Sequence, residues 1–426
     1  MNSDLIEIDA TSLRNLLQQQ GVSQADLAKK LDISTKTIQR WLNQSIRRVK
    51  PDTVDKLSAI FGVCPTKIHR DVPVLSLRVT DRTVAEICTE RVFERTRLND
   101  TWSTYIEMLK SVNADALSSE QRYIVFRNIG ISSFYLAKFQ AADLYLRLAG
   151  QIASLLENSN MKIDTIIWSA RRAEAFGDFK TAERLLSEAE ALLTSETDLS
   201  IQSEFYYFRS RVALHKGRLE QALQDIRHSL LVSYRRRVQP MPLTISLDYV
   251  HLVHIYIRMG NYKKAQITCK KLLRSAAITG WARGLMLAHF YLGMIEYFTK
   301  GPSEVSTRHF GKAHQTRRSL AIDRYCPLVT QAEFIGLVLT ERHAEARNLI
   351  AHRLQKSKKS PLYFALSAMD GALLAKVQGT KLRPSTIEKA YEFFAREEMH
   401  TAYSALKKIE DCETLDLAQV LDFHYI

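Results

Sequence analysis

The sequence predicts an all-α protein, with a small helical bundle followed by a long array of paired helices. Three observations lead to this prediction. Glycine and proline are scarce, at 15 and 9 of 426 residues, which disfavours a β-rich chain with many turns. Two short, capped helices are predicted close together near the N-terminus. Over the rest of the chain, small residues recur at intervals of about 40 residues.

The composition limits the classes of protein to which the chain can belong. Its length favours two or more folding units, and its 46% hydrophobic content can fill a packed interior. No apolar run reaches the ~18 residues of a transmembrane helix, and the acidic N-terminus, MNSDLIEIDA, lacks a secretory signal. The net charge of +14 favours a polyanionic partner. Five widely spaced cysteines without a CxxC pair indicate free thiols in a reducing cytoplasm and argue against zinc.

Residues 23–44, SQADLAKKLDISTKTIQRWLNQ, predict two short helices joined by a tight turn. Ser23 and Ser34 have side chains that cap helix N-termini, and Asp32 lies at the turn between the helices. A third helix is expected to follow Pro51 and to end at Gly62. The apolar positions that face inward are Leu27, Ala28 and Leu31 in the first helix and Ile38, Trp41 and Leu42 in the second.

The second helix leaves short polar and basic side chains on its outer face, as a helix that enters the DNA major groove requires. The loop after it is basic and suited to phosphate. Residues 34–50 contain five Lys or Arg and no acid, so the positive charge is concentrated there. The residues of this face and loop are Thr35, Lys36, Thr37, Gln39, Arg40, Asn43, Arg47, Arg48 and Lys50.

The N-terminal pattern resembles the helix-turn-helix of the Cro and lambda-repressor-like family over about residues 8–70. The matching positions are Ser23, Gln24, Leu27, Ala28, Ile33, Ser34, Ile38 and Trp41. Asp32 replaces the usual turn glycine where Asp tolerates a left-handed backbone, and Leu42 and Gln44 replace a frequent Glu and Gly. The resemblance implies that residues 1–70 bind double-stranded DNA, with Gln24 joining the residues above. The alternative is a solvated face of a helical repeat.

Residues 71–118 are expected to connect this domain to the array. The segment DVPVLSLRVT, residues 71–80, contains Pro73 and alternating apolar residues, which predict a short extended linker. Helical periodicity returns from about Thr83 to Leu109.

Residues 119–426 predict a repeat array. Small residues follow one another at intervals of 40, 40, 43, 41 and 40 residues, at Ala142, Ala182, Ala222, Ala265, Ser306 and Ala346. Small side chains are needed where two antiparallel helices approach closely. The pattern resembles a tetratricopeptide array with about six to seven repeats, the seventh near Ala390 and Phe394. The resemblance implies a right-handed α-solenoid, with helices longer than the usual 34-residue repeat contains.

The sequence offers no pattern typical of catalysis. Phosphate-binding loops, zinc-protease motifs, nucleophile elbows and dinucleotide-binding motifs are all missing. The SxxK pattern at Ser404 lacks its companion motifs, and the 12 histidines are dispersed. We expect no enzyme, no catalytic or metal-ligating residues and no cofactor.

The repeat register places Arg171, Arg211 and His254 at equivalent groove positions in three successive units. Arg127, Tyr207 and Arg258 are expected beside them. Guanidinium groups near aromatic rings suit a peptide carboxylate or another anionic ligand. The alternative is that these arginines pair with neighbouring glutamates of the chain, Glu174 and Glu204.

The two-part architecture resembles the peptide-sensing bacterial regulators of the RRNPP group and related phage lysis–lysogeny regulators. The resemblance implies a sequence-specific transcriptional regulator in quorum sensing, a homodimer whose array binds a short peptide and alters the placement of two DNA-binding heads. A protein–protein adaptor, or a regulator that acts by sequestering a partner protein, is the alternative. The operator, the effector and the sign of regulation do not follow from the sequence.

Overall fold

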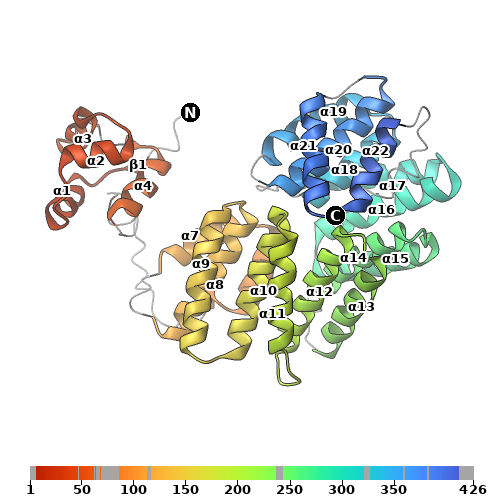
Figure 1. Cartoon of the computed structure of the whole chain (residues 1–426), viewed down its shortest axis with the longest axis horizontal. Coiled ribbons are helices and arrows are strands. Elements are labelled where there is room, and N and C mark those ends of the chain that lie inside the picture. The colour runs from red at the N-terminus through yellow and green to blue at the C-terminus, as the bar shows by residue number, and fades with distance from the viewer. Residues whose placement is uncertain are drawn as a thin grey trace. The chain divides into compact units, whose positions relative to one another are not determined.

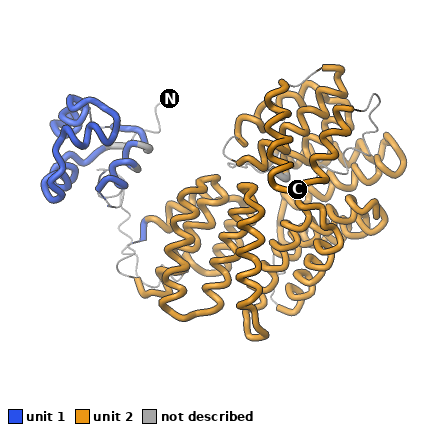
Figure 2. Tube along the Cα trace, in the orientation of Figure 1, with its two compact units in different colours: residues 1–84, 111–113 blue, residues 85–110, 114–426 orange. Residues whose placement is uncertain are grey.

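The computed structural model describes residues 6–46, 48–61, 63, 68, 86–112, 117–236, 243–320, 327–357, 360–380 and 383–411. The predicted linker, Gly62 and Arg47 lie outside these residues. The chain forms two compact units, one of residues 1–84 and 111–113 and the other of residues 85–110 and 114–426 (Figure 2). The segment 85–110 therefore belongs with the array, whereas the boundaries at residues 70 and 118 stay predictions.

The N-terminal unit is a small helical bundle with one short antiparallel strand pair, in which Ile6 pairs with Val49. Its elements are β1 (Ile6–Glu7), α1 (Ala10–Gln19), α2 (Gln24–Leu31), α3 (Thr35–Leu42), β2 (Arg48–Val49) and α4 (Pro51–Phe61). Leu13, Leu27, Ile38 and Leu57 form the fully buried centre of its core. The sequence analysis did not predict α1, although its apolar residues complete this core.

The turn between α2 and α3 has the predicted geometry. Ser23 Oγ accepts from the backbone N–H of Asp26, and Ser34 Oγ accepts from that of Thr37, so both serines cap their helices. Asp32 has φ 55° and ψ 48°, the left-handed conformation. An aspartate can therefore replace the usual glycine at this turn.

The second unit begins with α6 (Glu90–Asn99) and α7 (Trp102–Lys110) and continues as paired helices (Figure 1). The first helices of the pairs are α8 (Ser119–Tyr135), α10 (Ser159–Phe176), α12 (Leu199–His215), α14 (Leu243–Arg258), α16 (Ala282–Lys300), α18 (Pro327–Leu339) and α20 (Pro361–Val377). The second helices are α9 (Phe139–Leu155), α11 (Phe179–Leu192), α13 (Leu219–Arg235), α15 (Tyr262–Thr279), α17 (Glu304–Ser319), α19 (His343–Lys356) and α21 (Pro384–Arg396). The last described helix is α22 (His400–Asp411).

The recurring small residues lie where the two helices of each pair touch, which confirms the repeat prediction. Ala142, Ala182, Ala222, Ala265, Ala346 and Ala390 are completely buried, and Ser306 is 2% exposed. Each lies in the second helix of its pair. At Gly130 in α8, an added Cβ would lie 2.9 Å from Leu146 Cγ of α9. Glycine is therefore required there by the close approach of the two helices.

The last repeat contacts the second and third repeats. Ser360 Oγ donates a 2.8 Å hydrogen bond to the carbonyl of Ala175, and Gly177 packs against Phe393. Lys216 Nζ lies 3.0 Å from Glu398 Oε2. These residues are about 180 positions apart in the chain. We call this set the closing contact, because it joins α20–α22 to the turns at the ends of α10 and α12.

Replacing Ala182 by leucine is expected to lower the free energy of unfolding by about 1–3 kcal/mol, because the added methyl groups have no space between α10 and α11. Ala191→Leu changes an exposed alanine of the same helix and is the matched control. Urea unfolding monitored by circular dichroism measures both variants. Equal midpoints for Ala182→Leu and the wild type would contradict the assigned repeat register.

Candidate nucleic-acid interface and groove

The outer face of α3 presents the polar residues that the sequence predicted for it. Thr35, Lys36, Gln39 and Arg40 are exposed, while Ile38 is completely buried beneath them. Thr37 is half-buried, and its hydroxyl lies 2.9 Å from Ser34 Oγ. The buried side of α3 therefore fixes the helix, and the outer side is free to contact a ligand.

Exposed polar and basic residues follow α3. Asn43 ends the helix, and its Oδ1 accepts from the backbone N–H of Ser45 at 3.1 Å. Arg48 and Lys50 are exposed on either side of the buried Val49. The alternation of β2 therefore directs two cations outward. Arg47 lies outside the described residues.

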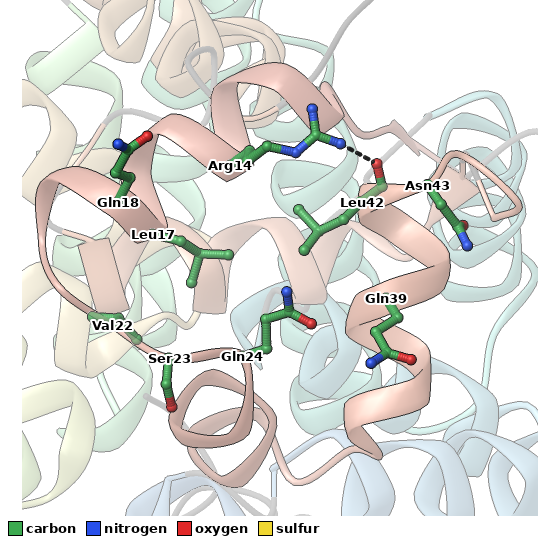
Figure 3. Close-up of a pocket in the computed structure, with 9 residues that line it drawn as sticks. All are labelled: Arg14, Leu17, Gln18, Val22, Ser23, Gln24, Gln39, Leu42 and Asn43. Atoms are coloured by element: carbon green, nitrogen blue, oxygen red, sulfur yellow. Dashed lines mark hydrogen bonds between the residues drawn. The ribbon is translucent and has the colours of Figure 1, made fainter.

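An open cavity of about 690 Å³ lies between α1, the start of α2 and the end of α3 (Figure 3). Gln24, Gln39 and Asn43, all predicted for the interface, line it together. Its remaining lining residues are Arg14, Leu17, Gln18, Val22, Ser23 and Leu42. The structure thus brings residues from three helices around one polar hollow.

Arg14 and Gln18 were missed by the sequence analysis. They are exposed one turn apart on α1, and Arg14 Nη2 donates a 2.8 Å hydrogen bond to the carbonyl of Leu42 (Figure 3). This carbonyl belongs to the last turn of α3, where a cation is favoured by the helix dipole. Predicting α1 from its apolar spacing would have placed both residues on its polar face.

The predicted basic strip of the array is already paired within the chain. Glu174, 2% exposed, forms ion pairs with both Arg171 and Arg211, the latter at 2.9 Å. His215 Nε2 lies 2.9 Å from the same Glu174 Oε1. The structure therefore shows the alternative pairing that the sequence analysis left open. The expectation of unneutralised charge along this strip in the ligand-free chain is wrong.

The other predicted groove residues also have partners of their own. Arg127 donates two hydrogen bonds to the carboxylate of Asp164, at 2.7 and 2.9 Å, and Arg258 donates to the carbonyl of Leu214 at 2.7 Å. His254 Nε2 lies 2.5 Å from the hydroxyl of Tyr291. Tyr207 contacts the ring of His251, 5.6 Å between centroids. Their role in effector binding remains a prediction.

Three buried histidines lie beside these arginines. Burial, followed by the charge of Arg211, lowers the pKa of His254 to about 3. The same two causes hold the pKa of His215 and of His251 well below the ordinary value. Although His215 lies against a carboxylate, Glu174 already pairs with two arginines, so a neutral imidazole that donates from Nε2 satisfies this contact.

Comparisons with known proteins agree with both parts of the architecture. A helix-turn-helix family model matches residues 13–68, and a tetratricopeptide repeat model matches residues 249–278, which span most of α14 and α15. No curated protein sequence is significantly similar to the chain. The chain thus combines a Cro-type helix-turn-helix with tetratricopeptide repeats, as predicted.

Two solved structures resemble the chain in fold. A Rap protein complexed with competence and sporulation factor is 14% identical with a TM-score of 0.50, and the match covers 94% of this chain and 99% of that one. A signal transduction ATPase with numerous domains and a tetratricopeptide repeat sensor, from Pyrococcus horikoshii, is 14% identical with a TM-score of 0.47, over 95% of this chain and 62% of that one. At this identity, the Rap match shows the fold alone.

Two searches of the described residues found nothing. Within the described ranges, no helix is long and apolar enough to span a bilayer. Across the same part of the chain, no group of three or more His, Cys, Asp or Glu side chains is placed to hold a metal ion.

Proposed function

We propose that the chain is a sequence-specific transcriptional regulator that binds double-stranded DNA through its N-terminal unit and senses an effector through its array. The observation that carries the proposal is the exposed face of α3, in a unit that matches a helix-turn-helix model. Lys36 and Arg40 are long enough to reach base edges, and guanine is the base that such side chains contact most often. Thr35, Thr37 and Gln39 would complete the reading surface.

The residues around α3 would position the unit on the DNA backbone. Gln24 opens α2, where backbone N–H groups and the helix dipole favour a phosphate. Arg14 donates one hydrogen bond to Leu42 and keeps further donors for phosphate oxygens. Asn43, Arg47, Arg48 and Lys50 would contact the phosphates on the other side of α3.

A single helix-turn-helix reads only one half-site, so we propose a homodimer assembled through the array. A groove ligand could then alter DNA affinity by changing the placement of two heads. A short peptide is the proposed effector, because the array has the fold of a Rap protein that was solved with a bound factor. The function requires no catalysis or cofactor, and its place is the cytoplasm, with the DNA.

The second candidate is a protein–protein adaptor or sequestering regulator, in which the array docks a partner protein. The pairing of Arg171 and Arg211 with Glu174 favours it, because it leaves these cations less available to an anionic effector. Electrophoretic mobility shift of genomic fragments with the intact chain separates the two candidates. Retention of a defined subset of fragments supports the regulator, and no retention at low salt supports the adaptor.

On a fragment selected in this way, Lys36→Ala and Arg40→Ala are each expected to weaken binding by about 1–3 kcal/mol, because each removes a contact to a base edge. Lys56→Ala removes an exposed lysine of α4 and is the matched control. Titration at physiological salt measures all three variants. Unchanged specific binding by both α3 variants would show that α3 does not read the DNA.

Arg48→Ala and Lys50→Ala are expected to weaken binding to selected and unrelated DNA alike, because phosphate contacts carry no sequence information. Each lost phosphate contact should reduce the slope of log K against log salt by about 1. Titrations of both DNAs between low and physiological salt measure this slope. A loss confined to the selected fragment would assign these residues to base readout instead.

A further inference from the structure

Helix α6 has a charged residue on its buried face. Phe93, Thr96, Arg97 and Asp100 are at most 9% exposed, and their spacing places them on one side of the helix and its C-cap. Arg91, Arg95 and Asn99 are exposed on the other side. The helix is therefore docked on the array through a face that contains a buried guanidinium and a buried carboxylate.

The partners of α6 come from repeats far along the chain. Arg97 Nη1 lies 3.4 Å from Glu204 Oε1 of α12, and its side chain is 5% exposed. Asp100 forms a buried ion pair with Arg283 of α16, whose Nη2 also reaches the carbonyl of Arg97 at 3.5 Å. Arg127 of α8 lies over the ring of Phe93, 5.0 Å from its centroid. One short segment thus contacts the first helices of three repeats.

Arg97 fills most of a polar hollow of the array. Only about 10 Å³ remains beside it, about the space of a single water. Ser203, Glu204 and Tyr207 of α12 and Thr244, Leu247 and Asp248 of α14 line this space. Asp248 is 1% exposed, and burial holds the pKa of its carboxyl well above the ordinary value. The hollow is therefore acidic, and a cation from the chain's own N-terminal segment occupies it.

The polar match at this interface is incomplete. Arg97 Nε, Glu94 Oε2, Asp248 Oδ2 and Thr244 Oγ1 are buried without a hydrogen-bond partner. Unsatisfied buried groups offset much of what the ion pairs contribute, and a helix of 10 residues is marginal by itself. By contrast, α7 packs on α8 through the buried Trp102, Tyr105, Ile106 and Leu109. Release of α6 alone should therefore require less free energy than release of both helices.

Release of α6 would change the connection to the DNA-binding unit. With α6 docked, 28 residues separate Phe61 from Glu90, and with α6 free, 40 residues separate Phe61 from Trp102. The 10 helical residues span about 15 Å as a helix, but about 33 Å when extended. A longer connection widens the range of distances that two heads can span on DNA.

We propose that α6 is a displaceable strap, held on the first helices of the array by Arg97 and Asp100, whose release lengthens the connection to the DNA-binding unit. A groove ligand that covers α12 and α16 would have to displace it. The strap rests on the proposed regulator function for its effect on DNA. Its docking and release are properties of the array alone, so the two parts can be tested separately.

Hydrogen exchange of the intact chain, measured by mass spectrometry, tests the docking. In the double variant Arg97→Ala, Asp100→Asn, amides of residues 93–99 are expected to exchange at least tenfold faster, with residues 103–110 unchanged. Asparagine is chosen because Asp100 has φ 55°, which Asn tolerates. Arg95→Ala, on the exposed face of the same helix, is the matched control. If the double variant does not fold, Asp100→Asn alone is measured in the same way.

Unchanged exchange in residues 93–99, or equal acceleration in α6, α7 and α8, would overturn the strap. DNA affinity is then compared on a genomic fragment that the wild type selects. The double variant is expected to differ from the wild type by at least threefold in Kd, and Arg95→Ala to match the wild type. Equal Kd values with α6 released would overturn the coupling. Failure of the wild type to bind any DNA would refute the proposed function, while the exchange data still decide the docking.

Discussion

Glu174→Gln is expected to lower the free energy of unfolding by about 3–5 kcal/mol, because it leaves two buried guanidinium groups without a counter-charge. Arg171 and Arg211 are 13% and 9% exposed and share this one carboxylate. Glutamine keeps the volume and a carbonyl acceptor, so the loss reports charge rather than a cavity. Urea unfolding at neutral pH, followed by circular dichroism, measures the change.

The matched control is Glu188→Gln, on the exposed surface of α11. Glu188 lies 3.6 Å from Arg184, and both side chains are about half exposed, so the change should be below about 0.5 kcal/mol. Adding Arg211→Met to Glu174→Gln should restore part of the stability, because it removes one uncompensated charge. Equal stability of Glu174→Gln and Glu188→Gln would show that the arginines find other partners when Glu174 is neutral.

The stability of the array is expected to fall steeply as the pH falls below about 6.5, the ordinary histidine value. His215, His251 and His254 are buried, and burial together with Arg211 lowers the pKa of each in the folded chain. Below the unfolded value, the unfolded chain binds protons that the folded chain excludes, so stability rises with pH. Each histidine contributes a slope of about 1.4 kcal/mol per pH unit, and the three together contribute about 4.

Urea unfolding between pH 7.5 and 5 measures this slope. His254→Gln should reduce it by about 1.4 kcal/mol per pH unit, because one excluded proton is lost. His352→Gln, which changes an exposed histidine of α19, is the control and should keep the wild-type slope. The same slope in His254→Gln and the wild type would mean that His254 is protonated in the folded chain.

Local patterns predicted most of the N-terminal unit. Capping by Ser23 and Ser34 and the turn at Asp32 each depend on residues within four positions in the chain, so the sequence contains the information. The small residues of the repeats were predictable for the same reason, because packing within a helix pair repeats with a fixed period. Arg14 was missed because its partner, the Leu42 carbonyl, is 28 positions away.

The groove could be predicted only in part, because its contacts join distant repeats. The register placed Arg171 and Arg211 on one strip, where the structure finds them. It could not decide that a single residue, Glu174, would pair with both. Nor could it show that α6 returns to α12 and α16, since the pairs Arg97–Glu204 and Asp100–Arg283 span 107 and 183 positions. Periodicity identifies which residues face inward, but not which residues cover them.

The closing contact gives the array a property that an open solenoid lacks. In an open array each repeat touches only its neighbours, so the terminal repeats can fray independently and the pitch can stretch like a spring. Here the seventh repeat also rests on the second and third, through Ser360, Gly177 and the Lys216–Glu398 pair. The C-terminal end is thereby no longer a free end, and a change of pitch must break these contacts. The array should consequently exist in discrete closed and open forms rather than in a continuum of curvatures.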